Sequence, residues 1–557
     1  MKLNKGVATK TVAILVAAIV VVAVFAGATL LRGPAVPTTT TPTATSPTTT
    51  PTTTPTTSPT TTPTVPATTP TTTKDTVKVA MGVDIDTVDP HDITTTAVFN
   101  ILRHCYETLV WIDEKGNLIP WLVERWTVSE DGKVYTFYIR KGIRFHDGTP
   151  LNASVVKANF DRWMDPTVKV SQRGQLGPLS KVEVIDEYTV RVYLRTPFAV
   201  FLRSLSTYLF ITSSKVIETY GNKTITEVVG TGPYKFVSWE KGKRIVLERN
   251  DNYWGNKSIL KRVEWLIIPE ASTRLAALLA GDVDFAFNLP PTDLERVKGD
   301  SRFAVVTPVS NRIIFVAMVP RGPLTDPKVR QAINYAVDVD AIIKNVLYDL
   351  AIKTNAPLPP HFFGFHEMPP YTYDPERAKK MLAEAGYPNG FKVTLMHPTG
   401  RYMQDKQVAE AVQAYLSKVG ITVELKTMDW PSFVAELRKP LQEKTYDMVL
   451  LGWGPGVADA HLALHGQFYS AQAPPSGLAA AHYNNSEVDK LLELGMSELN
   501  ETKRAEHYKK AIEIIWKDAP WIFLYTQKWF YGATAKLKNF VVNIDGEQIF
   551  FHKAYFT

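Results

Sequence analysis

The chain is poor in cysteine and lacks the short motifs that mark common enzyme classes. Its 557 residues include one cysteine, Cys105, so no intramolecular disulfide can form, and apolar neighbours predict a buried structural thiol. There is no H-E-x-x-H, no G-x-S-x-G and no P-loop. The net charge of +7 gathers in no basic block, which argues against a nucleic-acid partner. These absences favour a binding protein without a cofactor over an enzyme.

Charged residues are also missing from Val12 to Leu31, an apolar run of about 20 residues that is long enough to span a bilayer as a helix. Lys2, Lys5 and Lys10 precede the run, which places the N-terminus in the cytoplasm and the rest of the chain outside. We therefore expect residues 1–36 to hold the protein at the extracellular face of the cell membrane.

The same segment allows a second processing route. Lys5-Gly6 directly before the apolar run resembles the archaeal pilin-like signal peptides, which are cut after a glycine and leave the helix on the mature protein. Ala26-Gly27-Ala28 could instead serve a signal peptidase, which would release a secreted protein. No cysteine lies near this segment, so a lipid anchor on cysteine is excluded.

Residues 37–75 form a linker that is almost entirely Thr, Pro and Ser. Too few apolar side chains are present to offset chain entropy, so the linker cannot fold around a core. Its prolines favour an extended conformation, which at about 3.1 Å per residue could reach roughly 110 Å. Dense hydroxyls indicate an O-glycosylated stalk, and a spacer without sugar is the alternative.

A predicted hairpin between Gly230 and Gly255 organises the globular head that follows, with the sequence GTGPYKFVSWEKGKRIVLERNDNYWG. Gly230-Thr231-Gly232-Pro233 predicts a tight turn in which the glycines adopt positive φ. Two strands follow, over 234–239 and 245–248, joined by a polar loop. Tyr253 and Trp254 then provide large apolar anchors.

This string resembles the signature of the extracellular solute-binding proteins of ABC importers, family 5, the class that binds peptides, nickel and oligosaccharides. Two further strings match the family in order: Asp89-Pro90-His91, and Tyr106 to Leu109 at the end of a helix expected over 94–109. The string FHDGTPLNA at 145–153 matches a family hairpin, so His146 beside Asp147 indicates a turn and not catalysis.

The second half of the head predicts alternating strands and helices. Asp326-Pro327 and Asp374-Pro375 each place a capping acid and a proline at a helix start. A strand over 393–396, a helix over 404–418 and a strand over 422–426 form a βαβ unit, whose ligands bind beyond the carboxyl ends of the strands.

The resemblance covers residues 76–557 and implies an α/β, two-lobed, type II periplasmic-binding-protein-like fold with an additional small third domain. Ligand would be enclosed when the lobes close and then delivered to ABC permease subunits in the membrane; a monomer is expected. The expected division of the head is lobe I over 76–110, 197–308 and 521–557, a small domain over 111–196, and lobe II over 309–520.

Aromatic and amide side chains near the predicted cleft are the candidate ligand contacts, and one acid is added to them. The candidate residues are Trp453, Trp430, Tyr402, Asn288, Tyr106 and Asp459. In the peptide binders, the strand that ends in Gly-Trp is followed shortly by an aspartate that pairs with the peptide amino group. Counting from Trp453, that place falls at Gly456, and Asp459 comes three residues late. Without the acid a buried ammonium would lack its partner.

This departure favours a neutral, elongated ligand, an oligosaccharide before a peptide, because ring faces suit the apolar faces of sugars. Two further functions stay open. His461 and His465 would share one face of a helix and could bind a metal or metal chelate. The anchor and stalk alone would also fit a surface-layer or adhesion protein, but that function leaves the family strings unexplained.

Overall fold

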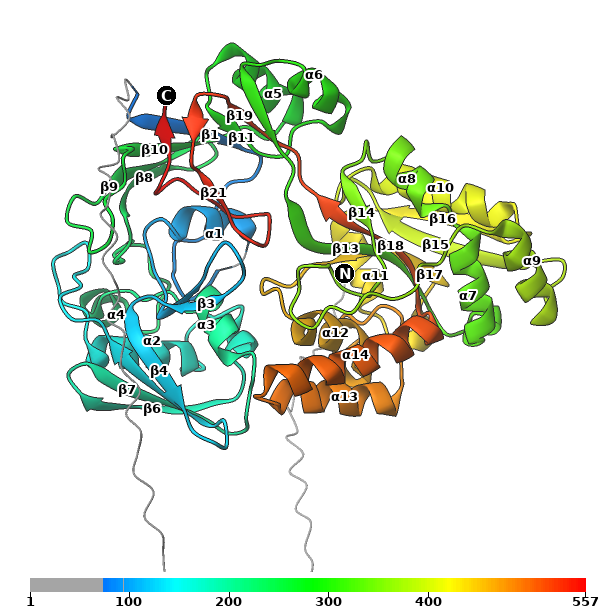
Figure 1. The fold of residues 1–557 in the computed structure, drawn as a ribbon, viewed down its shortest axis with the longest axis horizontal. Coiled ribbons are helices and arrows are strands. Elements are labelled where there is room, and N and C mark those ends of the chain that lie inside the picture. Colours follow the sequence, from blue (N-terminus) through cyan, green and yellow to red (C-terminus); the bar gives the residue numbers. More distant parts are fainter. Residues whose placement is uncertain (1–73, 94) are drawn as a thin grey trace, which may run out of the picture. The chain divides into compact units, whose positions relative to one another are not determined.

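The computed structural model describes residues 74–93 and 95–557, so the predicted anchor and nearly all of the predicted stalk lie outside the described residues. In the described part, three sheets organise the chain into two lobes and a third domain (Figure 1). The fold is α/β, as the sequence predicts.

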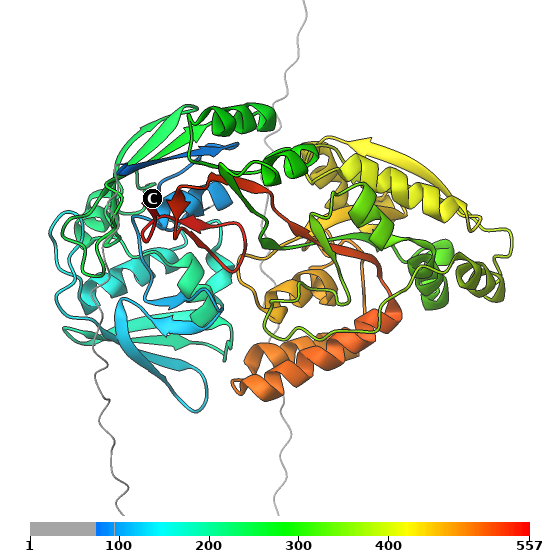
Figure 2. The ribbon, with the colours of Figure 1, turned by 45° about the horizontal axis from the view of Figure 1, so that its top comes forward.

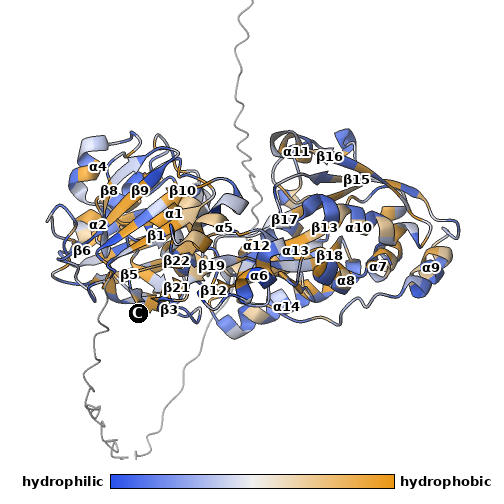
Figure 3. Cartoon of the chain, turned by 90° about the horizontal axis from the view of Figure 1, so that it is seen from above, coloured by the Kyte–Doolittle hydropathy of each residue, from blue (hydrophilic) through white to orange (hydrophobic). Residues whose placement is uncertain are grey.

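A seven-stranded mixed sheet forms lobe I. Its order is β12 (Phe303–Val306), β19 (Tyr531–Thr534), β11 (Phe285–Ala286), β1 (Thr76–Met81), β10 (Arg262–Ile267), β9 (Arg244–Arg249) and β8 (Tyr234–Glu240). Its helices are α1 (Thr96–Leu102), α5 (Ala271–Ala280) and α6 (Leu294–Lys298). The C-terminal segment adds two small hairpins, β20 (Leu537–Lys538) with β23 (Tyr555–Phe556) and β21 (Val541–Val542) with β22 (Ile549–Phe550). Figure 3 shows hydrophobic residues along β9 and β10.

The signature hairpin is the pair β8–β9, but the glycines before it serve a purpose that differs from the prediction. Neither Gly230 nor Gly232 has a positive φ. A Cβ added to them would lie 2.1 Å and 2.6 Å from the carbonyl oxygen of Cys105, so the turn needs glycine for close backbone approach. Gly232 N donates to that same oxygen at 2.8 Å. The predicted helix over 94–109 is consequently too long: α1 ends at Leu102 because the carbonyls of 104 and 105 bond to the turn.

The third domain is a four-stranded antiparallel sheet with a hydrophobic core of its own. Its sheet order is β4 (Val123–Val128), β5 (Val134–Ile139), β7 (Thr189–Leu194) and β6 (Leu179–Asp186). The helices α2 (Ala153–Met164), α3 (Phe201–Tyr208) and α4 (Ser214–Tyr220), and the hairpin of β2 (Val110–Ile112) and β3 (Leu118–Pro120), contribute to its core or pack beside it. This core extends from Leu109 to Val229, so the domain continues beyond the predicted boundary at 196.

Lobe II is built on a six-stranded mixed sheet. The order is β14 (Ala351–Lys353), β18 (Trp521–Lys528), β13 (Val309–Met318), β17 (Met448–Trp453), β15 (Lys392–Pro398) and β16 (Thr422–Met428). Two hydrophobic cores flank this sheet. The helices are α7 (Pro327–Ala336), α8 (Val339–Asn345), α9 (Pro375–Glu384), α10 (Asp405–Ser417), α11 (Trp430–Leu437), α12 (Ala460–Phe468), α13 (Ser486–Ser497) and α14 (Glu501–Asp518). The predicted βαβ unit is β15–α10–β16, with parallel strands.

The return to lobe I comes later than the predicted boundary at 521. Strand β18 pairs with β13 and β14 in the lobe II sheet, and the chain rejoins lobe I only after Lys528. Two neighbouring segments therefore connect the lobes, at Pro308 and at Trp529, and Trp529 N donates to Pro308 O at 2.9 Å. Figure 2 shows the two strands, green β13 and red β18, running together into lobe II.

Candidate functional site

A cavity of about 650 Å³ lies between the third domain and lobe II. The third domain contributes the segment around 172–178 and Phe198, and lobe II contributes the loop after β17 and the helix α12. Among the residues that the structure describes, no Asp, Glu, Lys or Arg lines this cavity. Its polar wall consists of uncharged groups, chiefly Gln172, Gln175, Gln472 and His461. Such a wall suits an uncharged polar group that both donates and accepts hydrogen bonds.

Trp453 is the predicted contact residue that lines this cavity. It is the last residue of β17, opposite Ile313 in the sheet. Its indole packs against Gly466, where an added Cβ would lie 2.4 Å from Cζ2 of the ring. Its Nε1 is buried and has no hydrogen-bond partner among the described residues. A ligand that offers an acceptor would satisfy this donor, since buried indole N–H groups usually find a partner.

The loop after Trp453 approaches both neighbours closely and leaves no room for side chains. A Cβ on Gly454 would lie 3.2 Å from Cα of Arg312, and a Cβ on Gly456 would lie 2.5 Å from the hydroxyl oxygen of Tyr208 in the third domain. Gly456 is the place where the comparison with peptide binders expects an acid. In this structure Tyr208 occupies the space that such a side chain would need.

Asp459 has a structural role. It is fully buried, its Oδ1 caps α12 by accepting from His461 N, and the same oxygen accepts from Arg504 at 2.5 Å. Both partners of this ion pair are at most 3% exposed. Arg504 neutralises this carboxylate, and Asp459 does not line the cavity beside Trp453, although its Oδ2 has no hydrogen-bond partner among the described residues. The structure therefore places Asp459 in an internal ion pair at the start of α12, away from the lining of the cavity.

Two arginines beside Tyr402 form a cationic part of the site that the sequence analysis missed. Arg401 lies 5.4 Å and Arg312 lies 5.9 Å from the centroid of the Tyr402 ring. Arg401 donates its backbone N–H to Asp405, but its guanidinium has no hydrogen-bond or ion-pair partner among the described residues. Loss of hydration together with repulsion from Arg312 lowers its pKa. Arg312 faces Glu547 of lobe I at 4.0 Å. The local charge therefore remains positive.

Glu547 belongs to the C-terminal segment of lobe I and accepts a hydrogen bond from Thr96 Oγ1 at 2.8 Å. Burial raises the pKa of its carboxyl group, and Arg312 opposes that shift. One half-buried carboxylate thus faces two guanidiniums. No motif signals this arrangement, because its members come from β13, from the loop after β15 and from the C-terminal segment.

Tyr402 and Trp430 follow the carboxyl ends of β15 and β16, as predicted, but both serve largely as packing. Tyr402 is 7% exposed, and its hydroxyl donates to Gly452 O at 3.3 Å. Trp430 is the first residue of α11, and not part of a loop as expected. Its ring stacks on Phe433 at 5.4 Å and lies under the guanidinium of Arg401 at 4.9 Å. The two rings thus support Arg401.

The remaining candidates lie elsewhere in lobe I. Tyr106 is fully buried, stacks on Phe210 and donates to Glu227 O, so it is a core residue. Asn288 is exposed with a φ of 48°, and its carbonyl accepts from Arg274 at 2.6 Å. Neither lines the cavity beside Trp453.

The histidine pair on α12 has no third ligand for a metal. His461 and His465 lie with ring centroids 5.0 Å apart. The described residues contain no group of three His, Cys, Asp or Glu side chains that could hold a metal ion. Burial lowers the pKa of His461 to about 3, so its imidazole is neutral in the cavity wall. The Nδ1 of His461 has no partner among the described residues.

The architecture indicates a ligand-binding protein: two lobes are joined by two connecting segments, and a cavity lies beside the end of a lobe II strand. Over residues 117–475 the sequence matches the model of the bacterial extracellular solute-binding proteins, family 5. The chain belongs to this family. The resemblance seen in the sequence is thereby confirmed, as is the type II periplasmic-binding-protein fold.

Relatives of this family 5 protein include the glutathione-binding protein GsiB of Pectobacterium atrosepticum, 32% identical over 84% of this chain and 91% of the relative. HbpA2 from Haemophilus parasuis matches in structure with a TM-score of 0.79 at 26% identity, covering 86% of this chain and all of HbpA2. DppA from Helicobacter pylori in complex with the peptide STSA has a TM-score of 0.72 at 29% identity, with 86% and 98% covered.

Membership assigns the general activity of this family 5 protein. It is the substrate-binding component of an ABC importer, and proteins of its family are solute-binding proteins outside the cytoplasm. Within residues 74–93 and 95–557, no helix is both long and apolar enough to cross a membrane.

Proposed function

We propose that this protein captures short peptides between lobe II and the rest of the head and delivers them to an ABC permease. The ligand carboxylate would bind Arg401 and Arg312, and an uncharged polar part would occupy the cavity beside Trp453. The observation that carries the proposal is the unpaired guanidinium of Arg401. Arg401 follows the carboxyl end of β15 and lies beside a second arginine, Arg312 of β13.

A carboxylate is the ligand group that best fits two neighbouring guanidiniums. Arginine presents a planar fork of donors that binds carboxylates through two parallel hydrogen bonds. Tyr402 and Trp430 hold the Arg401 side chain from below, so less freedom is lost when a ligand binds. A neutral sugar would leave the Arg401 guanidinium without an anionic partner in a site that closure removes from water, which is costly.

The expected preference for an oligosaccharide over a peptide rested on the missing acid at Gly456. The arginine pair supplies a charged contact that the sequence analysis did not foresee, and it favours a peptide that is recognised through its carboxylate. Names of relatives support the same direction: GsiB is a glutathione-binding protein, and DppA was solved with the peptide STSA. An oligosaccharide is the alternative, and the wall of glutamines and Trp453 is the feature that favours it.

We further propose that the protein acts as a monomer without enzymatic activity or a cofactor, and that the apolar run at 12–31 anchors it. The uncharged N-terminal run and the lysines before it support the anchor. N-terminal sequencing of membrane-extracted protein should begin at or before Val7, and a start at Thr29 would instead indicate ordinary secretion.

Calorimetry with matched ligands tests the peptide proposal. We expect tri-alanine or glutathione to bind, and the C-terminal amide of tri-alanine to bind at least tenfold more weakly, because hydrogen bonds to charged groups contribute about 1.5–3 kcal/mol. Arg401→Met should weaken tri-alanine binding by roughly 10- to 100-fold and reduce the preference for acid over amide. Arg377→Met is the matched control, since Arg377 is exposed, lies 3.8 Å over the Tyr335 ring and is remote from the cavity.

Two results would contradict the proposal. One is tight binding of maltotriose with no binding of either peptide. The other is equal affinity for the acid and the amide in the native protein.

A further inference from the structure

A second cavity, of about 250 Å³, lies between lobe I and the β2–β3 hairpin and is called the lobe I cavity below; it shares no residue with the cavity beside Trp453. Its lining comes from the segment 103–121, from Pro233 and Tyr253, and from the C-terminal segment 541–553. None of these residues belongs to lobe II, so occupancy would not require the lobes to close. The volume lies below the range of pockets for drug-sized ligands and suits a small molecule.

A buried arginine without a carboxylate partner lies in the wall of this lobe I cavity. Arg103 is 6% exposed, and its Nη2 donates to Ser206 O at 2.6 Å. Its Nε is buried without a partner, and no ion pair to Arg103 is found among the described residues. Burial lowers its pKa to about 10, and the negative charge of Asp545 opposes that shift. A buried guanidinium without an anion is unfavourable, so an anionic ligand would relieve it.

Aromatic rings form the flat part of the wall. The guanidinium of Arg103 lies 4.6 Å from the Trp111 ring. Trp111 in turn contacts Trp121 and Phe550, with ring centroids 5.5 Å apart in both pairs. Trp121 is fixed by the hydrogen bond from its Nε1 to Glu107 at 2.8 Å. A planar ring packs well against such indole surfaces.

Besides Arg103, the wall carries Lys115, Lys553 and three carboxylates that already accept hydrogen bonds or an ion pair. The Glu107 carboxylate accepts hydrogen bonds from Trp121, Tyr253, Trp254 and Thr231, which use its acceptor capacity. At the rim, Glu114 pairs with Lys553, and Asp113 accepts from the backbone of its own turn. His552 is neutral, since burial lowers its pKa to about 4. Arg103 therefore sets the sign of the group that the cavity would accept.

We propose that this lobe I cavity is a second ligand site, which binds a small carboxylate carrying a planar aromatic ring. The carboxylate pairs with Arg103, and the ring lies against Trp111 and Trp121. The site acts independently of peptide capture, because no residue of lobe II lines it.

Phenylacetate and phenylacetamide are the probes for this site, since they differ in charge but have nearly the same shape. Calorimetry with the full head should show phenylacetate binding at least tenfold more tightly than phenylacetamide. Saturating tri-alanine should leave the phenylacetate affinity unchanged. Small-angle scattering should show no decrease in the radius of gyration when phenylacetate alone is bound.

Two variants and a control connect the binding to the cavity. Arg103→Met should abolish the preference for the acid; without ligand its melting temperature should be equal to or above that of the native protein, because an unpaired buried charge has been removed. Ile119→Trp fills the cavity and should abolish binding of both probes. Arg302→Met is the control: Arg302 is exposed on lobe I, where it pairs with Asp300, lines neither cavity, and its replacement should leave both affinities unchanged.

The inference is overturned if phenylacetate does not bind, if acid and amide bind equally, or if Ile119→Trp retains phenylacetate affinity. A negative result with phenylacetate would not contradict the proposed peptide capture, because peptide binding is measured separately, with tri-alanine at the cavity beside Trp453.

Discussion

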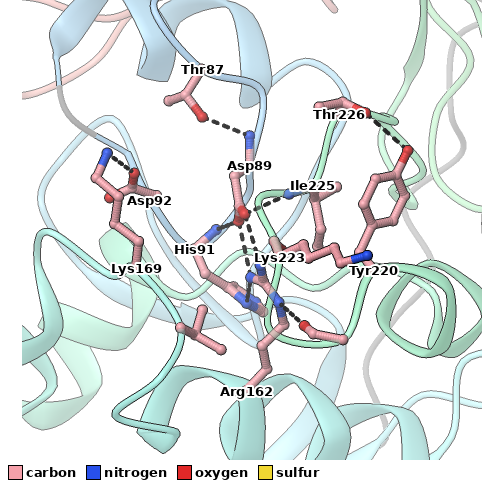
Figure 4. Close-up of polar contacts among 12 residues, drawn as sticks. Thr87, Asp89, His91, Asp92, Arg162, Lys169, Tyr220, Lys223, Ile225 and Thr226 are labelled. Atoms are coloured by element: carbon pink, nitrogen blue, oxygen red, sulfur yellow. Dashed lines mark hydrogen bonds and ion pairs between the residues drawn. The ribbon is translucent and has the colours of Figure 1, made fainter.

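The third domain meets its two neighbours in different ways. Its border with lobe I is built from buried polar bonds. Arg162 of α2 pairs with Asp89 of lobe I through two hydrogen bonds of 2.8 and 3.0 Å, and both side chains are at most 2% exposed (Figure 4). Ile225 N donates to the same carboxylate, and Arg162 also donates to Lys223 O. The hydrogen bonds of Arg162 and Asp89 would break if the third domain and lobe I moved apart.

Its border with lobe II is mainly apolar and surrounds a cavity. Val457, from the loop after β17, joins the core of the third domain, and Phe198 meets His461 edge-on with centroids 6.0 Å apart. One backbone hydrogen bond, from Ala199 N to Met496 O at 2.8 Å, crosses this border. Apolar contact has little directional requirement, so these surfaces can separate and meet again.

The difference predicts which parts move. We expect the third domain and lobe I to behave as one body and lobe II to close against both, turning about the neighbouring segments at Pro308 and Trp529. The strings Asp89-Pro90-His91 and Gly230 to Pro233, which identify the family in the sequence, lie at or beside the polar border and hold that body together.

The largest expected effect comes from breaking the polar border. Arg162→Met leaves the Asp89 carboxylate buried without its cation, which should lower the free energy of unfolding by about 3–5 kcal/mol. Urea denaturation measures this change. Arg302→Met is the control, because the Arg302–Asp300 pair is exposed and should contribute about 0–1 kcal/mol. Equal losses in the two variants would contradict a special role for the border.

Acid should weaken the same border. Burial lowers the pKa of His146, whose Nε2 lies 3.0 Å from Gly232 O, to about 4. Between pH 6.5 and about 4, His146 of the unfolded chain binds a proton that His146 of the folded protein does not. The contribution of neutral His146 to the free energy of unfolding is therefore complete above pH 6.5 and is lost as the pH falls to about 4. The upper bound is about 3 kcal/mol, at 1.36 kcal/mol per pKa unit. In His146→Gln the unfolding free energy should depend less on pH in this window, and an unchanged slope would refute the assignment.

At the apolar border, we expect the indole ring of Trp453 to contribute more to ligand binding than to the stability of the fold. Trp453→Ala should weaken peptide binding by roughly 1–3 kcal/mol, by analogy with other aromatic platforms, and calorimetry with tri-alanine measures it. Circular dichroism should show that the variant remains folded. Native-like affinity in the folded variant would mean that Trp453 serves only the core of lobe II.

The smallest expected effect is no change at all. Spin labels at Lys181 in the third domain, Lys298 in lobe I and Lys380 in lobe II can be attached through cysteine variants, because Cys105 is fully buried. Saturating tri-alanine should shorten the distances from Lys380 to the other two labels and leave the distance from Lys181 to Lys298 constant. A change in that last distance would show that the third domain moves independently.

The sequence by itself determined much of the local structure and the family. Caps and breakers placed α7 and α9, alternation and turn signals placed β8 and β9, and the order of strand, helix and strand predicted the parallel pair β15–β16. These features depend on neighbours in the chain, so patterns of a few residues carry them. The match of GTGPY and its following strands to family 5 was specific for the same reason.

Only the tertiary structure decided the site. Arg312, Arg401 and Glu547 lie on separate segments of the sequence. They gather because the fold brings the start of β13, the loop after β15 and the C-terminal segment of lobe I close together. The same packing placed Asp459 against Arg504, enclosed Tyr106 in the core and kept β18 in the lobe II sheet. Which polar groups are left without partners depends on contacts between residues far apart in sequence, and local patterns contain no record of those contacts.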